Sequence, residues 1–153
     1  MITYKDIRIA VNRQLSKTGI RINSRDVQEG FIRPSFFVQL DNVSRSGNET
    51  QIERSMTVRI YYFPSDRYEY SIEALETQEI LEDLFDLKLP VRDRLFNVEE
   101  FNTFLNDGVL NCQFDIDFYD GRKKVWKTEE DAEHELLHPI EKMKELEVNT
   151  SEE

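Results

Sequence analysis

The sequence is poor in the residues that cross-link or interrupt a chain. Its 153 residues include one cysteine, five glycines and four prolines. A single Cys112 excludes an internal disulfide framework and fits a reducing compartment. The scarcity of glycine and proline predicts long regular elements joined by few loops. A chain of this length forms one ordinary domain with its own core, so the fold needs no disulfide or metal.

Positive charge and long apolar runs are also scarce. Twenty Lys and Arg stand against 31 Asp and Glu, which gives a formal net charge of −11. Such acidity argues against nucleic-acid binding, because affinity for a duplex comes mainly from clustered Lys and Arg. No apolar run approaches the length of a membrane span, and "MITYKDIRIA" lacks the uncharged core of a signal peptide. We therefore expect a soluble intracellular protein that contacts no membrane and binds no nucleic acid stably.

Histidine is limited to two residues, and both lie in "HELLH". His134 and His138 with Glu135 form the HExxH pattern of zinc hydrolases, in which two imidazoles bind zinc and the glutamate acts as general base. Pro139 argues against this function, because proline disfavours helical geometry in the preceding residue and clashes with the carbonyl four residues back. No third ligand stands out nearby. A zinc hydrolase is therefore the weaker alternative, and surface imidazoles are expected.

An acidic stretch, "DIDFYDG", has a faint likeness to a calcium loop. Asp115, Asp117 and Asp120 precede a glycine, but the oxygen spacing is off by one. Ile116 and Phe118 lie between these carboxylates and fit the buried face of a strand. We therefore interpret the acids as outward residues of a strand that runs into a hairpin turn.

Cys112 is the remaining candidate for chemistry. A cysteine nucleophile needs a nearby base, whereas Cys112 alternates inward with Leu110 and Phe114 and is expected to be a core thiol. The chain contains no P-loop, GxGxxG or GxSxG motif. The sequence thus assigns no catalytic, cofactor-binding or metal-binding residue, and the protein is expected not to be an enzyme and to need no cofactor.

Hydrophobic periodicity in the first half predicts one helix and three strands. The helix covers about residues 3–17, begins with Thr3 and Asp6 and stops at Gly19. "GIRIN" and "RPSFFVQLD" are predicted strands, "VSRSGNETQ" a polar turn region, and "IERSMTVRIYYF" a long half-buried strand. The expected inward residues of the helix and the long strand are Tyr4, Ile7, Ala10, Val11 and Leu15, and Ile52, Met56, Val58, Ile60 and Tyr62.

The second half predicts a further helix and two or three strands. The helix lies in "EYSIEALETQEILEDLFDL" and ends at Pro90. "RLFNVEEFNTFL" is strand-like, "NDG" is a tight turn, and Asp120–Gly121 is expected to turn the chain again. The expected inward residues are Ile72, Leu75, Ile80, Leu84 and Leu87, widened by Leu81 and Phe85, and then Leu110, Cys112, Phe114, Ile116 and Phe118.

These elements predict an α+β fold. We expect a mostly antiparallel sheet of about four to six strands, two amphipathic helices packed on one face, and a C-terminal helix or tail. Residues 1–127 form the single α+β domain, and residues 128–153 form an acidic helical extension that ends in a disordered tail. The other sheet face is too polar for a core and too regular for a loop, so it is available to a partner or to solvent.

Three stretches resemble a known family: "MITYKDIRIAVNRQL", "EGFIRPSFFVQL" and "DGVL…FDIDF". They are similar to the tail terminator (tail completion) proteins of long-tailed bacteriophages, in the form found in phages and prophages of Gram-positive bacteria. The resemblance covers roughly residues 1–120 and does not extend to the region after Gly121, which contains "HELLH".

This resemblance implies a structural function without catalytic residues. Proteins of this kind form a ring, usually hexameric, on the last layer of the tail tube, stop its polymerisation and present the head-joining surface. The implied partners are copies of the chain, the tail tube protein and head–tail connector or neck proteins, in the virion tail and in the host cytoplasm during assembly. A monomer in solution is compatible with this function. The alternative is another head–tail connector or neck protein.

Overall fold

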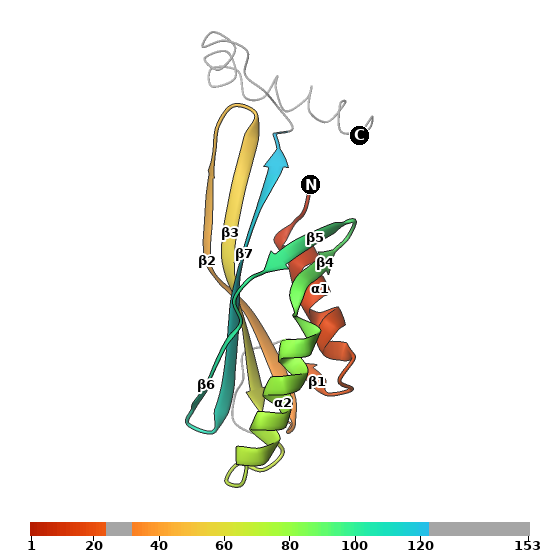
Figure 1. The fold of residues 1–153 in the computed structure, drawn as a ribbon, viewed down its shortest axis with the longest axis vertical. Helices are drawn as coiled ribbons and strands as arrows, with labels where there is room; N and C mark the ends of the chain where they lie inside the picture. The colour runs from red at the N-terminus through yellow and green to blue at the C-terminus, as the bar shows by residue number, and fades with distance from the viewer. Residues whose placement is uncertain (24–31, 123–153) are drawn as a thin grey trace.

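The computed structural model describes residues 1–23 and 32–122. Two helices and seven strands form an α+β fold, as the sequence predicts (Figure 1). In chain order they are α1 (Tyr4–Ser16), β1 (Arg21–Asn23), β2 (Ser35–Gly47), β3 (Gln51–Phe63), α2 (Ser71–Leu84), β4 (Leu87–Val91), β5 (Arg94–Val98), β6 (Asn102–Asn106) and β7 (Val109–Gly121).

Five strands form the main sheet, in the order β1-β2-β3-β7-β6. All neighbours pair antiparallel except β1 and β2, which pair parallel, and β4 and β5 form a separate antiparallel hairpin. The strands β2, β3 and β7 have 13 residues each. Their upper parts extend past both helices (Figure 1). The mostly antiparallel sheet of four to six strands is thus confirmed.

Helix α1 begins where the sequence places it. The Asp6 amide donates to the Thr3 hydroxyl oxygen at 3.1 Å, and the Thr3 amide donates to the Asp6 carboxylate at 2.9 Å. This reciprocal capping box satisfies two amides that the first turn leaves unpaired. At the other end, Gly19 has φ of 74°, a conformation that glycine adopts without strain. Within the predicted stripe only Tyr4 is exposed.

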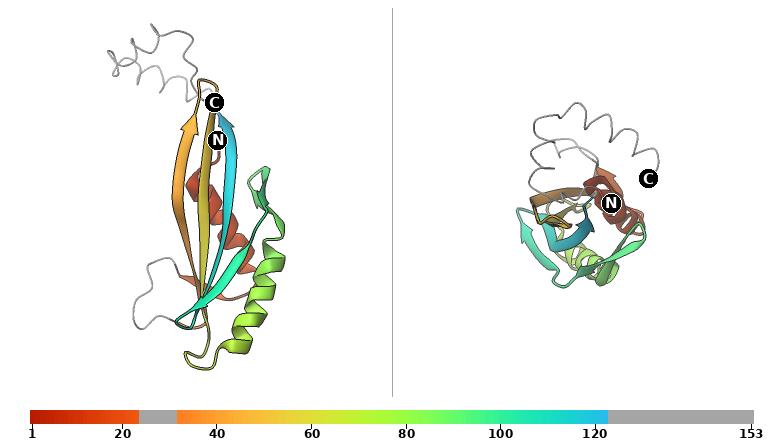
Figure 2. Two further views of the ribbon diagram at one scale, coloured as in Figure 1. Left: turned by 60° about the vertical axis from the view of Figure 1, so that its left-hand side comes forward. Right: turned by 90° about the horizontal axis from the view of Figure 1, so that it is seen from above.

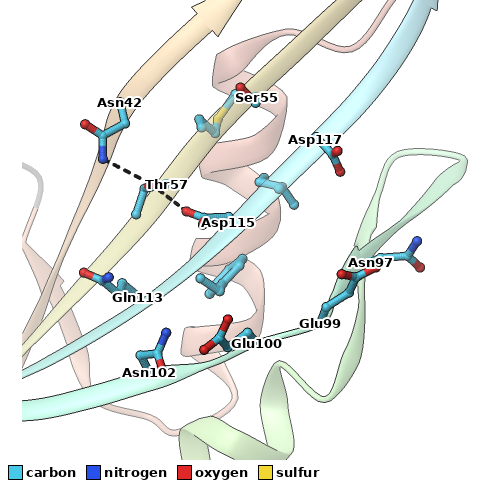
Figure 3. Close-up of a pocket in the computed structure, with 13 residues that line it drawn as sticks. Asn42, Ser55, Thr57, Asn97, Glu99, Glu100, Asn102, Gln113, Asp115 and Asp117 are labelled. Atoms are coloured by element: carbon cyan, nitrogen blue, oxygen red, sulfur yellow. Dashed lines mark hydrogen bonds between the residues drawn. The ribbon is translucent and has the colours of Figure 1, made fainter.

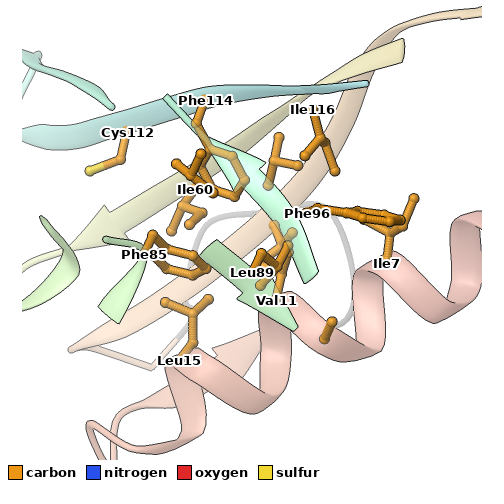
Figure 4. Packing of buried hydrophobic residues seen from close by; sticks show 14 of the residues in the cluster. Ile7, Val11, Leu15, Ile60, Phe85, Leu89, Phe96, Cys112, Phe114 and Ile116 are labelled. Atoms are coloured by element: carbon orange, nitrogen blue, oxygen red, sulfur yellow. The ribbon is translucent and has the colours of Figure 1, made fainter. Parts of the chain in front are cut away.

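The core lies between the inner face of the sheet and a layer made of α1, α2 and the β4–β5 hairpin. Both helices lie on this same face of the sheet (Figure 1). The predicted alternation of β3 and β7 is confirmed, because every residue expected to point inward is buried. Figure 4 shows this packing, with side chains from α1, β3, β4, β5 and β7 filling the space between the sheet and the helix.

Helix α2 presents a different face to the core from the one its apolar pattern predicts. Its buried residues are Ala74, Thr77 and Leu81, followed by Phe85. Of the predicted inward residues, Leu81 and Phe85 are buried as expected and Leu84 is half-buried, whereas four are exposed: Ile72, Leu75, Ile80 and Leu87. Apolar residues occupy most directions around this helix, so periodicity alone does not select its buried side.

A hydrogen-bonded anchor fixes the rotation of α2 instead. The Tyr62 hydroxyl donates to Glu73 Oε1 at 2.6 Å, and the amide and hydroxyl of Ser65 donate to the same oxygen at 2.8 Å. Burial raises the pKa of Tyr62 to about 12, helped by its bond to Glu73. Burial also acts to raise the pKa of Glu73, but these hydrogen bonds outweigh it and hold that pKa below its usual value. The anchor turns Ala74 and Thr77 toward the core.

Two predicted turns are wrong in their extent. The polar region 43–51 is mostly strand, because β2 continues to Gly47 and only 48–50 connect it to β3. Asp120 and Gly121 do not turn the chain, since they pair with Ile52 and Gln51 of β3. In both places the polar residues belong to the part of the sheet that extends past the helices, where strands have few apolar neighbours. The polar residues there do not break the ladder: most of those in 43–51 are exposed, and Asp120 is paired with Arg94.

The region between α2 and β7 is also more divided than predicted. Pro90 does not end the second helix, which stops at Leu84; it lies in β4 opposite Leu95. Proline is tolerated there because both strands of a two-stranded sheet are edges. The strand-like stretch 94–105 is two strands, β5 in the hairpin and β6 in the main sheet.

The turn at "NDG" is confirmed. Asn106 pairs with Val109, and the two residues between them, Asp107 and Gly108, have φ of 53° and 77°. Such paired positive angles match the twist of the strands that the turn joins. The proposed boundary at 127 and the extension 128–153 lie outside the described residues. Within 1–23 and 32–122, no helix is long and apolar enough to cross a membrane.

Candidate functional site on the outer face of the sheet

The outer face of the sheet is the side that the helices do not cover. It carries the side chains that alternate with the core residues along β2, β3 and β7, as their register requires. Four of these are carboxylates and one is a guanidinium, and most of the others are uncharged polar residues. The residues of this face include Phe37, Gln39, Asp41, Ser44, Ser46, Glu53, Ser55, Thr57, Arg59, Tyr61, Asn111, Gln113, Asp115, Asp117 and Tyr119. The predicted polar face is confirmed.

Arg59 links three strands at the centre of this face. Its Nε lies 3.1 Å from Asp41 Oδ2 on β2, and its Nη1 donates to Gln113 Oε1 on β7 at 3.2 Å. Both side chains of the ion pair are partly exposed, so its contribution to stability is small. The bonds instead fix the positions of the side chains, which gives the face a defined polar surface.

Thr57 forms a second cross-strand connection. Its hydroxyl donates to Asp115 Oδ1 at 2.6 Å and accepts from Asn42 Nδ2 at 3.3 Å. Asn42 has φ of 51° and lies at a bulge where the register of β2 against β3 shifts. The bulge brings the Asn42 amide over Thr57, which is consequently buried although it points outward as predicted.

The lower end of the face is aromatic. Phe37 and Tyr61 stack with ring centroids 6.1 Å apart, and the Tyr61 hydroxyl donates to Gln39 Oε1 at 3.4 Å. Phe104 on β6 is about half-exposed and pairs with Asn111 across the strand. Exposed aromatic residues beside a hydrogen-bonded polar surface are typical of protein contact sites.

A groove of about 450 Å³ opens where the link from β5 to β6 leaves the edge of β7 (Figure 3). Its polar lining includes Glu99 and Glu100 from the link and Asp115 and Asp117 from β7. None of the residues that line it is Lys, Arg, His or Cys. The groove therefore offers no cation to a phosphate and no histidine or lysine to act as a base near neutral pH.

The three carboxylates of "DIDFYDG" do not converge. Asp115 and Asp117 lie on the outer face, whereas Asp120 lies on the inner side and accepts from Arg94 Nη1 at 2.8 Å. The strand interpretation is confirmed for the outward Asp115 and Asp117, but it is wrong for Asp120, which points inward and precedes no turn. Within the described part of the chain, no three or more His, Cys, Asp or Glu residues are grouped as a metal site would require. His134, Glu135 and His138 lie outside the described residues.

Cys112 is a core thiol, as the sequence predicts. It is buried on the inner face of β7, beside Ile60 of β3 in the ladder. Burial, and secondarily the charge of Glu82, raises its pKa to about 12. The thiolate that nucleophilic chemistry requires is therefore scarce at neutral pH.

One exposed surface was missed by sequence reasoning, and it lies on α2. Ile72 is 73% exposed and Leu75 is 61% exposed, and the neighbouring exposed residues are mostly acidic. The signal was present in the sequence as apolar residues on more sides of the helix than a single core contact can bury. The rotation set by Glu73 was needed to show which of them stay outside.

A family model described as phage tail terminator protein matches residues 6–131, which is most of the chain. The chain belongs to this family, and it is thus a structural protein of a phage tail. The matched range ends before His134, so "HELLH" lies beyond it. No curated protein matches the chain.

Proposed function

We propose that this protein ends the tail tube of a long-tailed phage of Gram-positive bacteria. It forms a hexameric ring on the last layer of tube subunits, stops their addition and presents the surface that the head joins. The observation that carries this proposal is the family match over residues 6–131. The described structure supports it with uncovered surfaces on a rigid sheet.

A protein that ends a polymer needs one surface that fits the last layer and another that does not recruit the next subunit. The sheet of this chain meets the first need, because its outer face is held by bonds within the chain, such as those of Arg59 to Asp41 and Gln113. A preorganised surface loses little conformational entropy when it binds. The part of β2, β3 and β7 that extends past the helices provides a second, separate surface (Figure 1).

The charge of the chain fits a passage for DNA. Four carboxylates and one guanidinium lie on the outer sheet face, and the groove beside β7 is lined by acids without a basic residue. Such surfaces repel a duplex and do not hold it. We therefore propose that the duplex passes the ring without a stable complex.

A head–tail connector or another neck protein is the second candidate. It is favoured by the same exposed acidic sheet, because a connector also encloses DNA and contacts neighbouring rings. The family match favours the terminator.

Polymerisation of the cognate tail tube protein tests the proposal. Purified protein is added during polymerisation, and tube lengths and ends are measured by electron microscopy. We expect short tubes with added density at one end only, at a ratio near six chains per capped end. A variant with Asp86→Lys and Asp93→Lys, two exposed residues outside the helices and strands, controls for a change in net charge alone and should cap tubes like the parent. Tubes that lengthen unchanged, or a salt-sensitive complex with duplex DNA at physiological ionic strength, would contradict the proposal.

A further inference from the structure

The two helices expose surfaces of opposite charge. Segment 1–23 contains five Lys and Arg and one acid, Asp6, which is engaged in the helix cap. Helix α2 contains five acids and no Lys or Arg. The chain as a whole is strongly acidic, so its basic residues are unusually concentrated on α1 and the residues just after it. We define the basic surface as Lys5, Ile9, Arg13 and Lys17, and the acidic surface as Ile72, Leu75, Glu76, Glu79 and Asp83, all of them exposed.

Each surface has an apolar centre between its charges. Lys5, Ile9 and Arg13 are spaced by four residues and form one line along α1. Ile72 and Leu75 lie beside Glu76 and Glu79 on α2, and these two apolar residues are the most exposed large aliphatic ones of that helix. An apolar strip with charges at its rim is the composition of a protein–protein contact.

The two surfaces belong to neighbouring helices that contact different parts of the sheet. Helix α1 contacts β1 and β2, whereas α2 contacts β7 on the other side of β3, and the two helices also contact each other. Figure 2 shows from above that both helices lie on the same side of the sheet. Among the described residues, β2 beyond Phe37 and β7 beyond Gln113 pair only with β3, so the sheet has an open strand edge at β2 and another at β7. At the first edge, Arg8 of α1 donates to the Val38 carbonyl at 2.9 Å.

We propose that the basic surface of one subunit docks on the acidic surface of the next, so that the ring is joined by α1 against α2. The proposal rests on the ring of the proposed function and names its contact. Two different complementary surfaces on one chain make a head-to-tail contact, which closes into a ring when the rotation allows it. Contacts between like surfaces place like charges together, which disfavours a dimer that pairs α1 with α1 or α2 with α2.

Charge reversal on one surface at a time tests this contact. One variant has Glu76→Lys and Glu79→Lys, and the other has Lys5→Glu and Arg13→Glu; all four positions are exposed, so thermal melts should show both variants folded. We expect each variant alone to lose tube capping at least tenfold, because like charges then meet. The control with Asp86→Lys and Asp93→Lys, which has the same change in net charge as the first variant, should cap like the parent.

An equimolar mixture of the two variants should restore capping. In one contact, the α2 of the first variant, now basic, meets the α1 of the second variant, now acidic. In the next contact, the unchanged basic α1 of the first variant meets the unchanged acidic α2 of the second. This alternation closes only in rings with an even number of subunits, as a hexamer allows. Restoration in the mixture, with neither variant active alone, supports the contact. Capping by each variant at the parental level would overturn it and leave the terminator function standing.

Sedimentation of the variants without tubes separates the two proposals. At low salt and high concentration, we expect the mixture to associate more strongly than either variant alone. If the mixture associates more strongly but the parent fails to cap tubes, the contact between α1 and α2 is supported and the terminator function is contradicted. If the mixture sediments like the separate variants, the contact between α1 and α2 is wrong.

Discussion

The two helices of this domain use their apolar residues differently. Helix α1 buries Ile7, Val11 and Leu15 and exposes one large aliphatic residue, which has basic neighbours. Helix α2 buries Leu81 together with small residues, and it exposes Ile72 and other apolar residues, which have acidic neighbours. Both contact the same sheet. The apolar content of α1 therefore serves mainly the core, and that of α2 exceeds what the core can bury.

The ends of the helices explain why one was easier to predict than the other. Helix α1 has a capping box in its own first residues, so sequence alone fixes where it begins. Helix α2 follows Tyr70, which forms no side-chain cap, and its rotation depends on the contact of Glu73 with Tyr62. A contact between distant residues leaves no periodic signal.

A substitution that disrupts the core face of the sheet beneath both helices should have the largest effect on the stability of the domain. Val58 is fully buried on the inner face of β3. Val58→Asp places an unpaired carboxylate there, at a cost of several kcal/mol, which is about the whole stability of a domain. We expect no cooperative thermal transition at neutral pH.

The neighbouring Arg59→Gln is the matched control for this prediction. Arg59 points to the outer face, where its ion pair is partly exposed, so its loss should cost at most about 1 kcal/mol. If Val58→Asp melted at the temperature of the parent, Val58 would face solvent, and the inner and outer faces of β3 would be the reverse of those described.

Substitution of leucine by alanine at two positions of α2 distinguishes the side of the helix that packs on the core from the side that is exposed. Leu81 is fully buried and Leu75 is 61% exposed. We expect Leu81→Ala to reduce the free energy of unfolding by about 2–5 kcal/mol, because it leaves a cavity. Leu75→Ala should change it by at most about 0.5 kcal/mol. Urea unfolding of both variants measures the difference, and equal losses would show that α2 is rotated from the position described.

A smaller effect concerns the anchor that sets this rotation. The folded-state pKa of Glu73 is lowered, so its carboxylate stabilises the fold above the unfolded pKa, near 4.5, and this stabilisation is lost as pH falls through the folded pKa. Glu73→Gln should therefore cost about 1 kcal/mol at pH 7 and less in acid. Urea unfolding of parent and variant between pH 7 and pH 3 measures this. A difference that is constant over this range would show that the charge of Glu73 has no role.

The predictable parts of the fold are those in which a residue's environment follows from its immediate neighbours. The alternation along β3 and β7 has a period of two whatever the strands pair with, and Asp107–Gly108 is a local turn. The β4–β5 hairpin was missed because it is short and contains Pro90. The polar outer face could be predicted for the same reason as the core face, but the burial of Thr57 by Asn42 depends on a bulge that has no clear sequence signal.

Cross-linking shows whether α1 of one subunit lies against α2 of the next in the proposed ring. A variant with Ile9→Cys and Ile72→Cys has one new thiol at the centre of each surface. The native Cys112 is buried, with its pKa raised to about 12, so it should not react in the folded protein. Variants with only one of the two new cysteines are controls, because like surfaces do not meet in a head-to-tail ring.

The double variant is bound to tail tube ends, treated with a short bis-maleimide and separated by denaturing electrophoresis. We expect a ladder of products that increases by one chain at a time and ends at six, with no dimer from either single variant. Capped tubes that yield no cross-linked product, or dimers from Ile72→Cys alone, would contradict a ring joined by α1 against α2.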